Sequence, residues 1–436
     1  MTLASSPTAE REHLGPNTRT AGILGRYAFF GAVLAFAGPP IYIHTPSLYA
    51  NQHGMSLAAI GVILLGLRLF DFVQDPLLGR WIAKTAMPRR SVVLIFSALL
   101  GLGALALFSP PSQVDARWWL AISLAVVFTG FSGLQIAYYS KGVSLADADG
   151  FSHARVAGFR ESGILVGICA ACIAPSALAM VFGGDMAFPA FAAIFAAILV
   201  VAVIRMHGRW ETKANRPQSS TPVLSGGFKT LLRDGQVRRL LVIGLLNALP
   251  TGFTATLFLF FVEDRLQAPD HTGAALLLFF LSAGAAAPLW ARLSGSIGAK
   301  RAMLIGMAGS VIAFLWAVTL GPGDWLAFYA IAVASGAALG ADMILLPAML
   351  SNRLAQQKLS SEHGFGLWGF VNKAALGLAA GLALPLLDYQ GYVPGASNPT
   401  AALDALSFAY AGIPCMLKVA ATLLLLCSPM TEETHR

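Results

Sequence analysis

Residues 62–84 read VILLGLRLFDFVQDPLLGRWIAK, and this stretch decides the fold. It is long and apolar enough to cross a membrane as one helix, because about 20 residues span a bilayer core. Three ionisable side chains interrupt it, namely Arg68, Asp71 and Asp75. At the helical repeat these three fall within roughly a 60° arc on one face. The sequence therefore predicts a membrane helix that carries one charged stripe.

This charged stripe has two interpretations. An ionised side chain at bilayer depth costs at least about 2.5–3.5 kcal/mol, so the three groups must face a protein interior or a wet cavity and neutralise one another. They form either a structural Arg/Asp clamp or part of an ion pathway. The two aspartates favour the pathway, because carboxylates one helical turn apart repel and a bound Na⁺ or H⁺ relieves that repulsion.

The composition of the whole chain is that of a polytopic membrane protein. Its 436 residues are 56% hydrophobic and only 11% charged, and the mean hydropathy is +0.69. This predicts an all-α membrane protein with twelve transmembrane helices. The apolar windows lie at 27–49, 58–80, 91–110, 117–140, 158–182, 186–204, 240–262, 273–291, 302–320, 325–350, 363–387 and 404–427.

The positions of the basic residues predict the topology. Four basic residues, Arg68, Arg160, Lys373 and Lys418, lie within the spans. Every other Lys and Arg except Arg117 and Arg265 falls on the side of the two termini, which is therefore expected to be cytoplasmic. These residues lie in short connections, so no nucleic-acid partner is expected. The predicted parts are a cytoplasmic tail at 1–26, a six-helix bundle at 27–204, a cytoplasmic linker at 205–239, a second six-helix bundle at 240–428 and a tail at 429–436.

Polar side chains on the span at 117–140 extend the candidate site. Ser132, Gln135 and Tyr139 have the spacing i, i+3, i+7 and share a helix face. Hydroxyl and amide oxygens beside two carboxylates are suitable ligands for Na⁺. Tyr138 and Tyr139 either pack in the protein interior or line a cavity. Arg160 either snorkels to the membrane interface or also lines the cavity.

The second half of the chain carries a few isolated polar groups. Lys373 lies within an apolar run, and its ammonium group needs a carboxylate partner, for which the aspartates of residues 62–84 are the obvious candidates. Lys418 has no evident partner in the sequence, and snorkelling or local pairing is expected. Asp342 is expected well inside its span, as a second coupling site.

Three segments carry a resemblance to a known family. Residues 68–79, RLFDFVQDPLLG, resemble the span-two motif of the melibiose-carrier-like family, the glycoside-pentoside-hexuronide:cation symporters of the major facilitator superfamily. Residues 137–161, AYYSKGVSLADADGFSHARVAGFRE, look like its passage from span four to span five. Residues 365–378, FGLWGFVNKAALGL, look like its lysine-bearing span eleven. The resemblance implies two six-helix bundles, the major facilitator fold, that alternate around a central site.

The resemblance also implies residue roles. The cation site would consist of Asp71, Gln74, Asp75, Ser132 and Gln135, with Asp71 and Asp75 as the metal ligands if the ion is Na⁺. Three residues are expected to couple ion and solute, namely Arg68, Asp342 and Lys373. The residues expected to contact the solute are Tyr138, Tyr139, Arg160, Asn247, Trp368 and Asn372.

The implied function is symport of a small organic solute with Na⁺ or H⁺, the solute being a sugar or glycoside. Two departures keep an alternative open: the span at 27–49 has no acid, and Gln135 stands where sugar-transporting members carry an aspartate. The alternatives are a lysophospholipid or another amphipathic solute, and a proton-coupled efflux antiporter.

Other classes of function find no support in the sequence. No hydrolase elbow, metal-ligand cluster or phosphate loop stands out, so we expect no enzyme activity and no cofactor besides the coupling ion. The expected partners are the solute and the lipid bilayer. We expect a monomer in the cell membrane, and specifically in a bacterial inner membrane.

Overall fold

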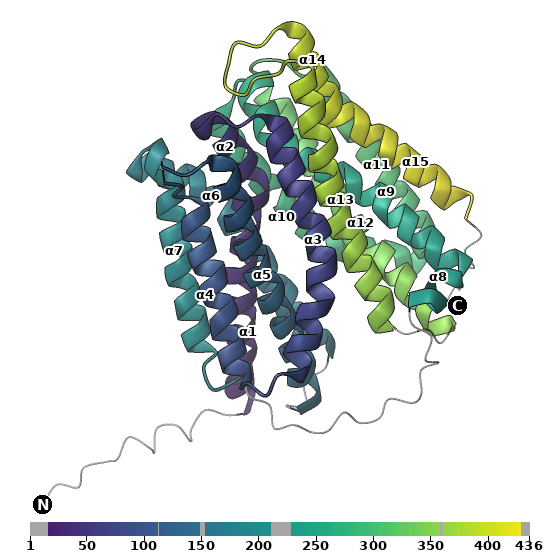
Figure 1. The fold of residues 1–436 in the computed structure, drawn as a ribbon. Helices are drawn as coiled ribbons and strands as arrows, with labels where there is room; N and C mark the ends of the chain where they lie inside the picture. The colour runs from purple at the N-terminus through teal and green to yellow at the C-terminus, as the bar shows by residue number, and fades with distance from the viewer. Residues whose placement is uncertain are drawn as a thin grey trace, which may run out of the picture.

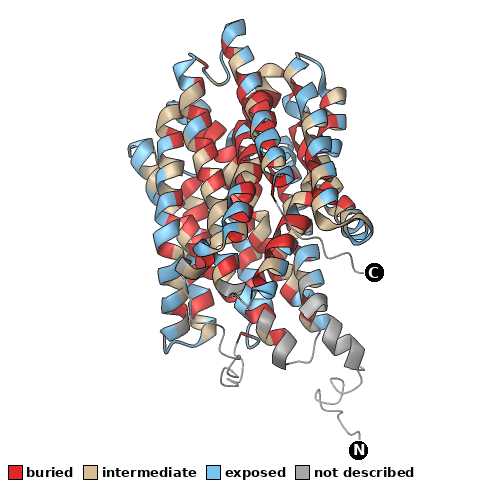
Figure 2. Ribbon diagram, turned by 90° about the vertical axis from the view of Figure 1, so that its right-hand side faces the viewer, coloured by how far each residue is buried: buried red, intermediate tan, exposed pale blue. Residues whose placement is uncertain are grey.

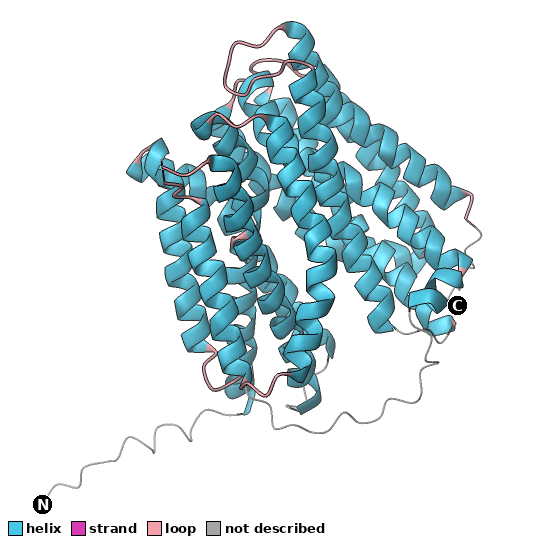
Figure 3. Ribbon diagram, viewed as in Figure 1, coloured by secondary structure: helices cyan, strands magenta, loops and turns pink. Residues whose placement is uncertain are grey.

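The computed structural model describes residues 16–111, 113–148, 153–210, 228–357, 359 and 361–428. Within these ranges the regular structure is helical, and no strand is present (Figure 3). In the described part of the chain, twelve segments are long and apolar enough to cross a membrane, and each overlaps one of the predicted windows. The tails predicted at 1–26 and 429–436 and the linker predicted at 205–239 lie wholly or partly outside the described residues.

The first bundle contains six spans. Span one is broken at Pro39 and Pro40, because proline lacks the N–H that a regular helix needs. Ser56 caps the next helix by accepting a hydrogen bond from the Ala59 N–H at 3.3 Å. The elements are α1 (Pro16–Phe36), the π-helical η2 (Pro40–His44), α2 (Thr45–His53), α3 (Leu57–Lys84), α4 (Arg89–Leu107), α5 (Ala116–Ala148), α6 (His153–Phe182) and α7 (Gly184–Arg205). Helix α1 therefore begins inside the predicted tail.

The second bundle follows a short helix, α8 (Phe228–Arg233). Its last span is again composite, with a π-helical turn before Pro414. The elements are α9 (Gly235–Phe260), η3 (Phe261–Arg265), η4 (Pro269–His271), α10 (Thr272–Ile297), α11 (Ala299–Leu315), η5 (Trp316–Thr319), α12 (Trp325–Gln356), α13 (Ser361–Tyr389), α14 (Thr400–Ser407), η6 (Phe408–Gly412) and α15 (Ile413–Leu426).

The two bundles lie side by side (Figure 1). They meet mainly through two helix pairs, α3 with α13 and α6 with α10, and α9 also contacts η2. Glycines bring these pairs close together. A Cβ on Gly61 of α3 would lie 2.9 Å from the Ala380 carbonyl oxygen of α13, and one on Gly273 of α10 would lie 3.1 Å from the Cys172 carbonyl oxygen of α6. Buried residues run through the interior of the helix assembly, and exposed residues cover its outer faces (Figure 2).

A charged cap ties α9 to α12 just outside the membrane spans. Asp234 accepts hydrogen bonds from the backbone N–H groups of Gln236 and Val237, each at 2.9 Å. Arg353 Nη2 lies 2.7 Å from Asp234 Oδ2. Partial burial opposes ionisation of Asp234, but the bonds from Arg353 and from the helix N-terminus outweigh it and hold its pKa below the ordinary 3.8.

This cap predicts an acid-sensitive contribution to stability. Because the pKa of Asp234 is lowered by folding, its contribution is complete above pH 3.8 and is lost as the pH falls through the lower folded value. Asp234→Asn keeps a good cap but removes the charge, and should flatten the pH dependence of the melting temperature in that range. Asp234→Ala should in addition cost about 0.5–2 kcal/mol at neutral pH. Equal melting curves for wild type and both variants would contradict this account.

Candidate functional site

A cavity of about 1010 Å³ lies between the two bundles. Helices α3 and α5 line it from the first bundle and α13 lines it from the second. The predicted charged stripe of α3 faces this cavity. The lining residues are Arg68, Asp71, Phe72, Asp75, Pro76, Gly79, Ser132, Gln135, Ile136, Tyr139, Ser140, Phe365, Gly366, Leu367, Gly369, Phe370 and Lys373.

The first pair of charges in the stripe is deeply buried. Arg68 Nη1 lies 2.8 Å from Asp71 Oδ2, and the side chains are only 6% and 1% exposed. The guanidinium carbon of Arg68 lies 4.2 Å from the ring centroid of Phe128 and 4.7 Å from that of Tyr42. Aromatic faces attract a cation, so charge pairing and ring contacts together fix Arg68 in place. This pair has the geometry of a clamp.

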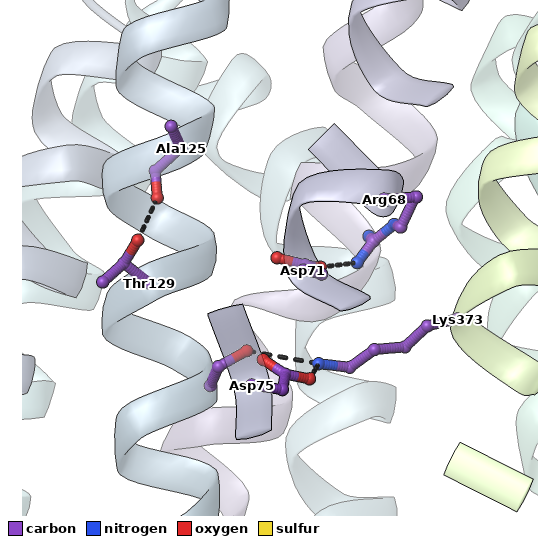
Figure 4. A network of polar contacts seen from close by, with 7 residues as sticks. Arg68, Asp71, Asp75, Ala125, Thr129 and Lys373 are labelled. Carbon is purple, nitrogen blue, oxygen red and sulfur yellow. Dashed lines mark hydrogen bonds and ion pairs between the residues drawn. The ribbon is translucent and has the colours of Figure 1, made fainter. Parts of the chain in front are cut away.

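The second pair joins the bundles. Lys373 of α13 reaches across to form an ion pair with Asp75 of α3 (Figure 4). Its Nζ also donates a hydrogen bond to Ser132 Oγ of α5 at 3.2 Å. The side chains of Lys373 and Asp75 are 26% and 29% exposed, far more than those of the clamp. The structure thus gives Lys373 the aspartate partner that its position in the sequence required.

Several buried polar atoms of α3 lack a hydrogen-bond partner. Within the described residues, Oδ1 of Asp71, Oδ1 of Asp75 and both polar atoms of Gln74 form no hydrogen bond. A buried polar group without a partner is costly and needs an explanation. Carboxylate and amide oxygens are the ligands that hard cations prefer, so these donors fit Na⁺ chemically.

Two side chains of α5 connect the central cavity to a second one. Gln135 and Tyr139 line both the central cavity and an adjoining, largely apolar cavity of about 430 Å³. Arg160 of α6 places its guanidinium carbon 4.6 Å from the ring centroid of Tyr139. Its Nη2 pairs with Glu161 Oε1 at 2.9 Å, and Glu161 lines the apolar cavity. Arg160 therefore lines neither cavity itself, but it contacts Tyr139, which lines both.

Tyr138 lies in a different environment from its neighbour. Its ring stacks on Tyr27 with the centroids 4.3 Å apart. Each hydroxyl donates to the other residue's carbonyl oxygen, at 3.2 Å from Tyr138 and 3.3 Å from Tyr27. Tyr138 borders the apolar cavity, but its hydroxyl is already occupied in helix packing. Its main contacts are structural.

The polar residues predicted in the second half meet at a third cavity. This cavity of about 320 Å³ borders the apolar one, because Met343 and Leu376 line both. The Asn372 side chain donates to the Trp368 carbonyl oxygen at 2.9 Å. The predicted residues that line this cavity are Asn247, Asp342, Trp368 and Asn372.

Lys418 has a partner that its sequence did not reveal. Its Nζ lies 2.5 Å from Asp342 Oδ2, so of the two expected arrangements, snorkelling and local pairing, the structure has local pairing. A signal was present, because Asp342 is the acid in the interior of a span of this bundle and Lys418 lies in the interior of another. Opposite charges buried in one bundle have to find each other, since neither is stable alone.

The packing around Arg68 predicts how the bundles can be separated. A Cβ on Gly377 of α13 would lie 2.4 Å from Arg68 Cγ, whereas one on Gly66 of α3 would meet nothing within 4 Å. Gly377→Ala should push α3 away from α13, at a cost of about 1–3 kcal/mol to this conformation. Spin labels at Gln52 and Ser397, introduced as cysteines, should then report longer distances. Gly66→Ala should leave them unchanged, and the same distances in both variants would refute the prediction.

Twelve membrane spans in two bundles around a charged, partly polar central cavity define a membrane transporter with the major facilitator fold. A family model described as MFS/sugar transport protein matches residues 27–432. The chain therefore belongs to this melibiose-carrier-like family of the major facilitator superfamily, as its motifs predicted. The description of this family is that of transport proteins, not of enzymes.

Curated relatives match parts of the chain. The human sodium-dependent lysophosphatidylcholine symporter 1 is 27% identical over 248 residues, which cover 55% of this chain and 46% of that protein. The Xenopus tropicalis protein of the same name is 30% identical over 169 residues, which cover 37% of this chain and 32% of that protein. The matched regions thus span about half of these relatives or less.

Solved structures share the fold. The crystal structure of the nucleoside transporter NupG superposes with a TM-score of 0.68 at 14% identity, covering 93% of this chain and 98% of that one. A bacterial homologue of the human lysosomal transporter Spinster, in an inward-facing and unoccupied conformation, gives a TM-score of 0.62 at 14% identity, with 95% of each chain covered. At these identities the likeness establishes the twelve-helix fold, which was predicted correctly.

Proposed function

We propose that the protein couples the movement of Na⁺ to the import of an amphipathic solute, by symport. The observation that carries this proposal is the contact of Lys373 with Asp75 and Ser132, because it places a charged tie between the bundles inside the central cavity. In alternating access the two bundles rock about a central site. An ion pair that joins the bundles at this site is therefore positioned to respond to a bound cation.

The coupling step is an exchange of cations on the α3 carboxylates. In the present arrangement the ammonium group of Lys373 neutralises Asp75. A sodium ion held by the unpartnered oxygens of Asp71, Asp75 and Gln74 takes over that role and releases Lys373 from the first bundle. The relative stability of the two bundle arrangements then changes. Because linkage is reciprocal, solute and ion raise each other's affinity.

The lining of the cavities supports an amphipathic solute. Aromatic side chains, Phe72, Phe365 and Phe370, line the central cavity next to the charges. The adjoining 430 Å³ cavity is mostly apolar and offers room for a hydrocarbon chain. The names of the curated relatives, which are sodium-dependent lysophosphatidylcholine symporters, make a lysophospholipid the first solute to test.

A sugar or glycoside is the second candidate. The family description names sugar transport. The 320 Å³ cavity combines an indole ring, Trp368, with the amides of Asn247 and Asn372, and Asn247 Oδ1 is buried without a hydrogen-bond partner in the described structure. Aromatic faces beside amide groups can bind a hydroxylated ring.

The proposed topology has both termini in the cytoplasm, from the distribution of basic residues. The central cavity then lies on the cytoplasmic side, between bundles at 27–204 and 240–428 that the segment 205–239 links. The proposed setting is the cell membrane, as in a bacterial inner membrane, with the monomer as the transporting unit.

Ligand-induced stabilisation in nanodiscs tests the proposal without a transport assay. We expect lysophosphatidylcholine to raise the melting temperature in NaCl but not in choline chloride, because a ligand at about 100 times its Kd adds roughly 2.7 kcal/mol of stability. Glycerophosphocholine, which lacks the acyl chain, is the matched control and should have little effect. Stabilisation by melibiose alone would support the second candidate, and the absence of any Na⁺ effect would refute Na⁺ coupling.

A further inference from the structure

The ion pair of Asp342 and Lys418 lies inside the second bundle, away from the Asp71–Asp75 site. Asp342 comes from α12 and Lys418 from α15, and their side chains are 10% and 6% exposed. Burying two charges is costly, and a purely apolar pair of similar size is often as stable. The coupling step described above makes no use of this pair, so its presence needs another reason.

Asp342 stands where two cavities meet. It lines the polar 320 Å³ cavity and also a smaller cavity of about 40 Å³ in the core of the bundle. The small cavity is large enough for water, since a water molecule needs about 10–15 Å³ measured in this way. Hydroxyl side chains surround it, namely Thr251, Thr254, Ser310 and Ser335. Both cavities that Asp342 lines are therefore large enough to hold water beside its carboxylate.

One oxygen of the Asp342 carboxylate is unused. Lys418 occupies Oδ2, whereas Oδ1 is buried and has no hydrogen-bond partner among the described residues. The only other titratable side chain lining either cavity is Cys415, whose Sγ faces the Val311 carbonyl oxygen at 3.8 Å. A single carboxylate already neutralised by an ammonium group is a poor site for a metal cation, which needs several oxygen ligands. A proton needs only one acceptor lone pair, and the unpartnered Oδ1 of Asp342 supplies it.

We propose that Asp342 and Lys418 form a second ion-linked site, which binds a proton and is independent of the α3 aspartates. A proton from cavity water converts the Asp342 carboxylate to a neutral carboxyl group, while Lys418 remains an ammonium ion. The charge attraction that ties α12 to α15 is then lost, and the hydroxyl oxygens of the small cavity become available to Lys418. Since Met343 on α12 lines the apolar 430 Å³ cavity that adjoins the central one, the change reaches the proposed solute pathway.

Infrared titration of the purified protein tests this site directly. We expect a band from a buried protonated carboxyl group that titrates with pH in the wild type and is lost in Asp342→Asn. In Lys418→Met the pH dependence of the band should change, because the neighbouring positive charge is gone. Asp342→Glu should keep a titrating band at a shifted frequency and serves if the Asn variant fails to fold.

Asp404→Asn is the matched control, because Asp404 pairs with Arg265 near an exposed end of the bundle and its side chain is 62% exposed. This variant should leave the infrared band of the buried carboxyl group unchanged. A band that is identical in the wild type, Asp342→Asn and Lys418→Met would overturn the proposal. The proposal would also be overturned if these variants lost stability and the wild type showed no titrating carboxyl band, because the pair would then be structural. Asp75→Asn should keep the titrating band while it loses the Na⁺ response, which separates this site from the proposed symport.

Discussion

Replacing Asp75 by Asn is expected to abolish Na⁺-stimulated uptake of lysophosphatidylcholine into proteoliposomes while the protein remains folded. The asparagine keeps the size of the side chain but removes the negative charge. In the proposed mechanism, Na⁺ replaces the Lys373 ammonium group at this charge. Coupling free energies of about 1–3 kcal/mol correspond to effects of 5–150-fold, so stimulation should fall to background. Folding should be little affected, because the Asp75–Lys373 pair is more than a quarter exposed and lies in the central cavity.

Two measurements accompany this prediction. The melting temperature of Asp75→Asn should no longer respond to Na⁺, which provides a readout independent of the solute. Asp404→Asn at the far end of the second bundle should behave as the wild type in both assays. Na⁺-stimulated uptake that persists in Asp75→Asn would remove this carboxylate from the coupling mechanism.

The spans and the main charged contact could be predicted from the sequence, for physical reasons. Apolar windows of bilayer length leave a helix little choice of position, so all twelve were found. Lys373 had to meet an acid, and the aspartates of α3 were the best candidates. The helical repeat could not show that Asp75 would be the partner and Asp71 would belong to Arg68, because this depends on how α13 crosses α3.

The remaining contacts depend on tertiary packing that no local pattern reports. The rings of Tyr42 and Phe128 around Arg68 come from η2 and α5, which are far from α3 in sequence. The pairing of Asp342 with Lys418 depends on α12 and α15 being close in the bundle. Local sequence identified these residues as polar groups in apolar spans, but their partners are a property of the fold.

Replacing Asp71 by Asn is expected to cause a large loss of stability, in contrast to the replacement of Asp75. Asp71 is 1% exposed, and its removal leaves the Arg68 guanidinium buried without a counter-charge. Breaking such a pair typically costs about 3–5 kcal/mol. The melting temperature in nanodiscs should fall well below that of Asp75→Asn, and an equal melting temperature for the two variants would show that the buried pair is no clamp.

The double variant Arg68→Met/Asp71→Leu separates the two interpretations of the charged stripe. Exchanging a buried ion pair for apolar residues of similar volume is often neutral or stabilising, so the melting temperature should recover. The Na⁺ response should not recover, because the Asp71 Oδ1 atom proposed as a sodium ligand is gone. Recovery of both properties would make Asp71 purely a clamp and leave Asp75 to bind the ion alone. Recovery of stability alone would show that one carboxylate serves both roles, holding Arg68 with one oxygen and the travelling ion with the other.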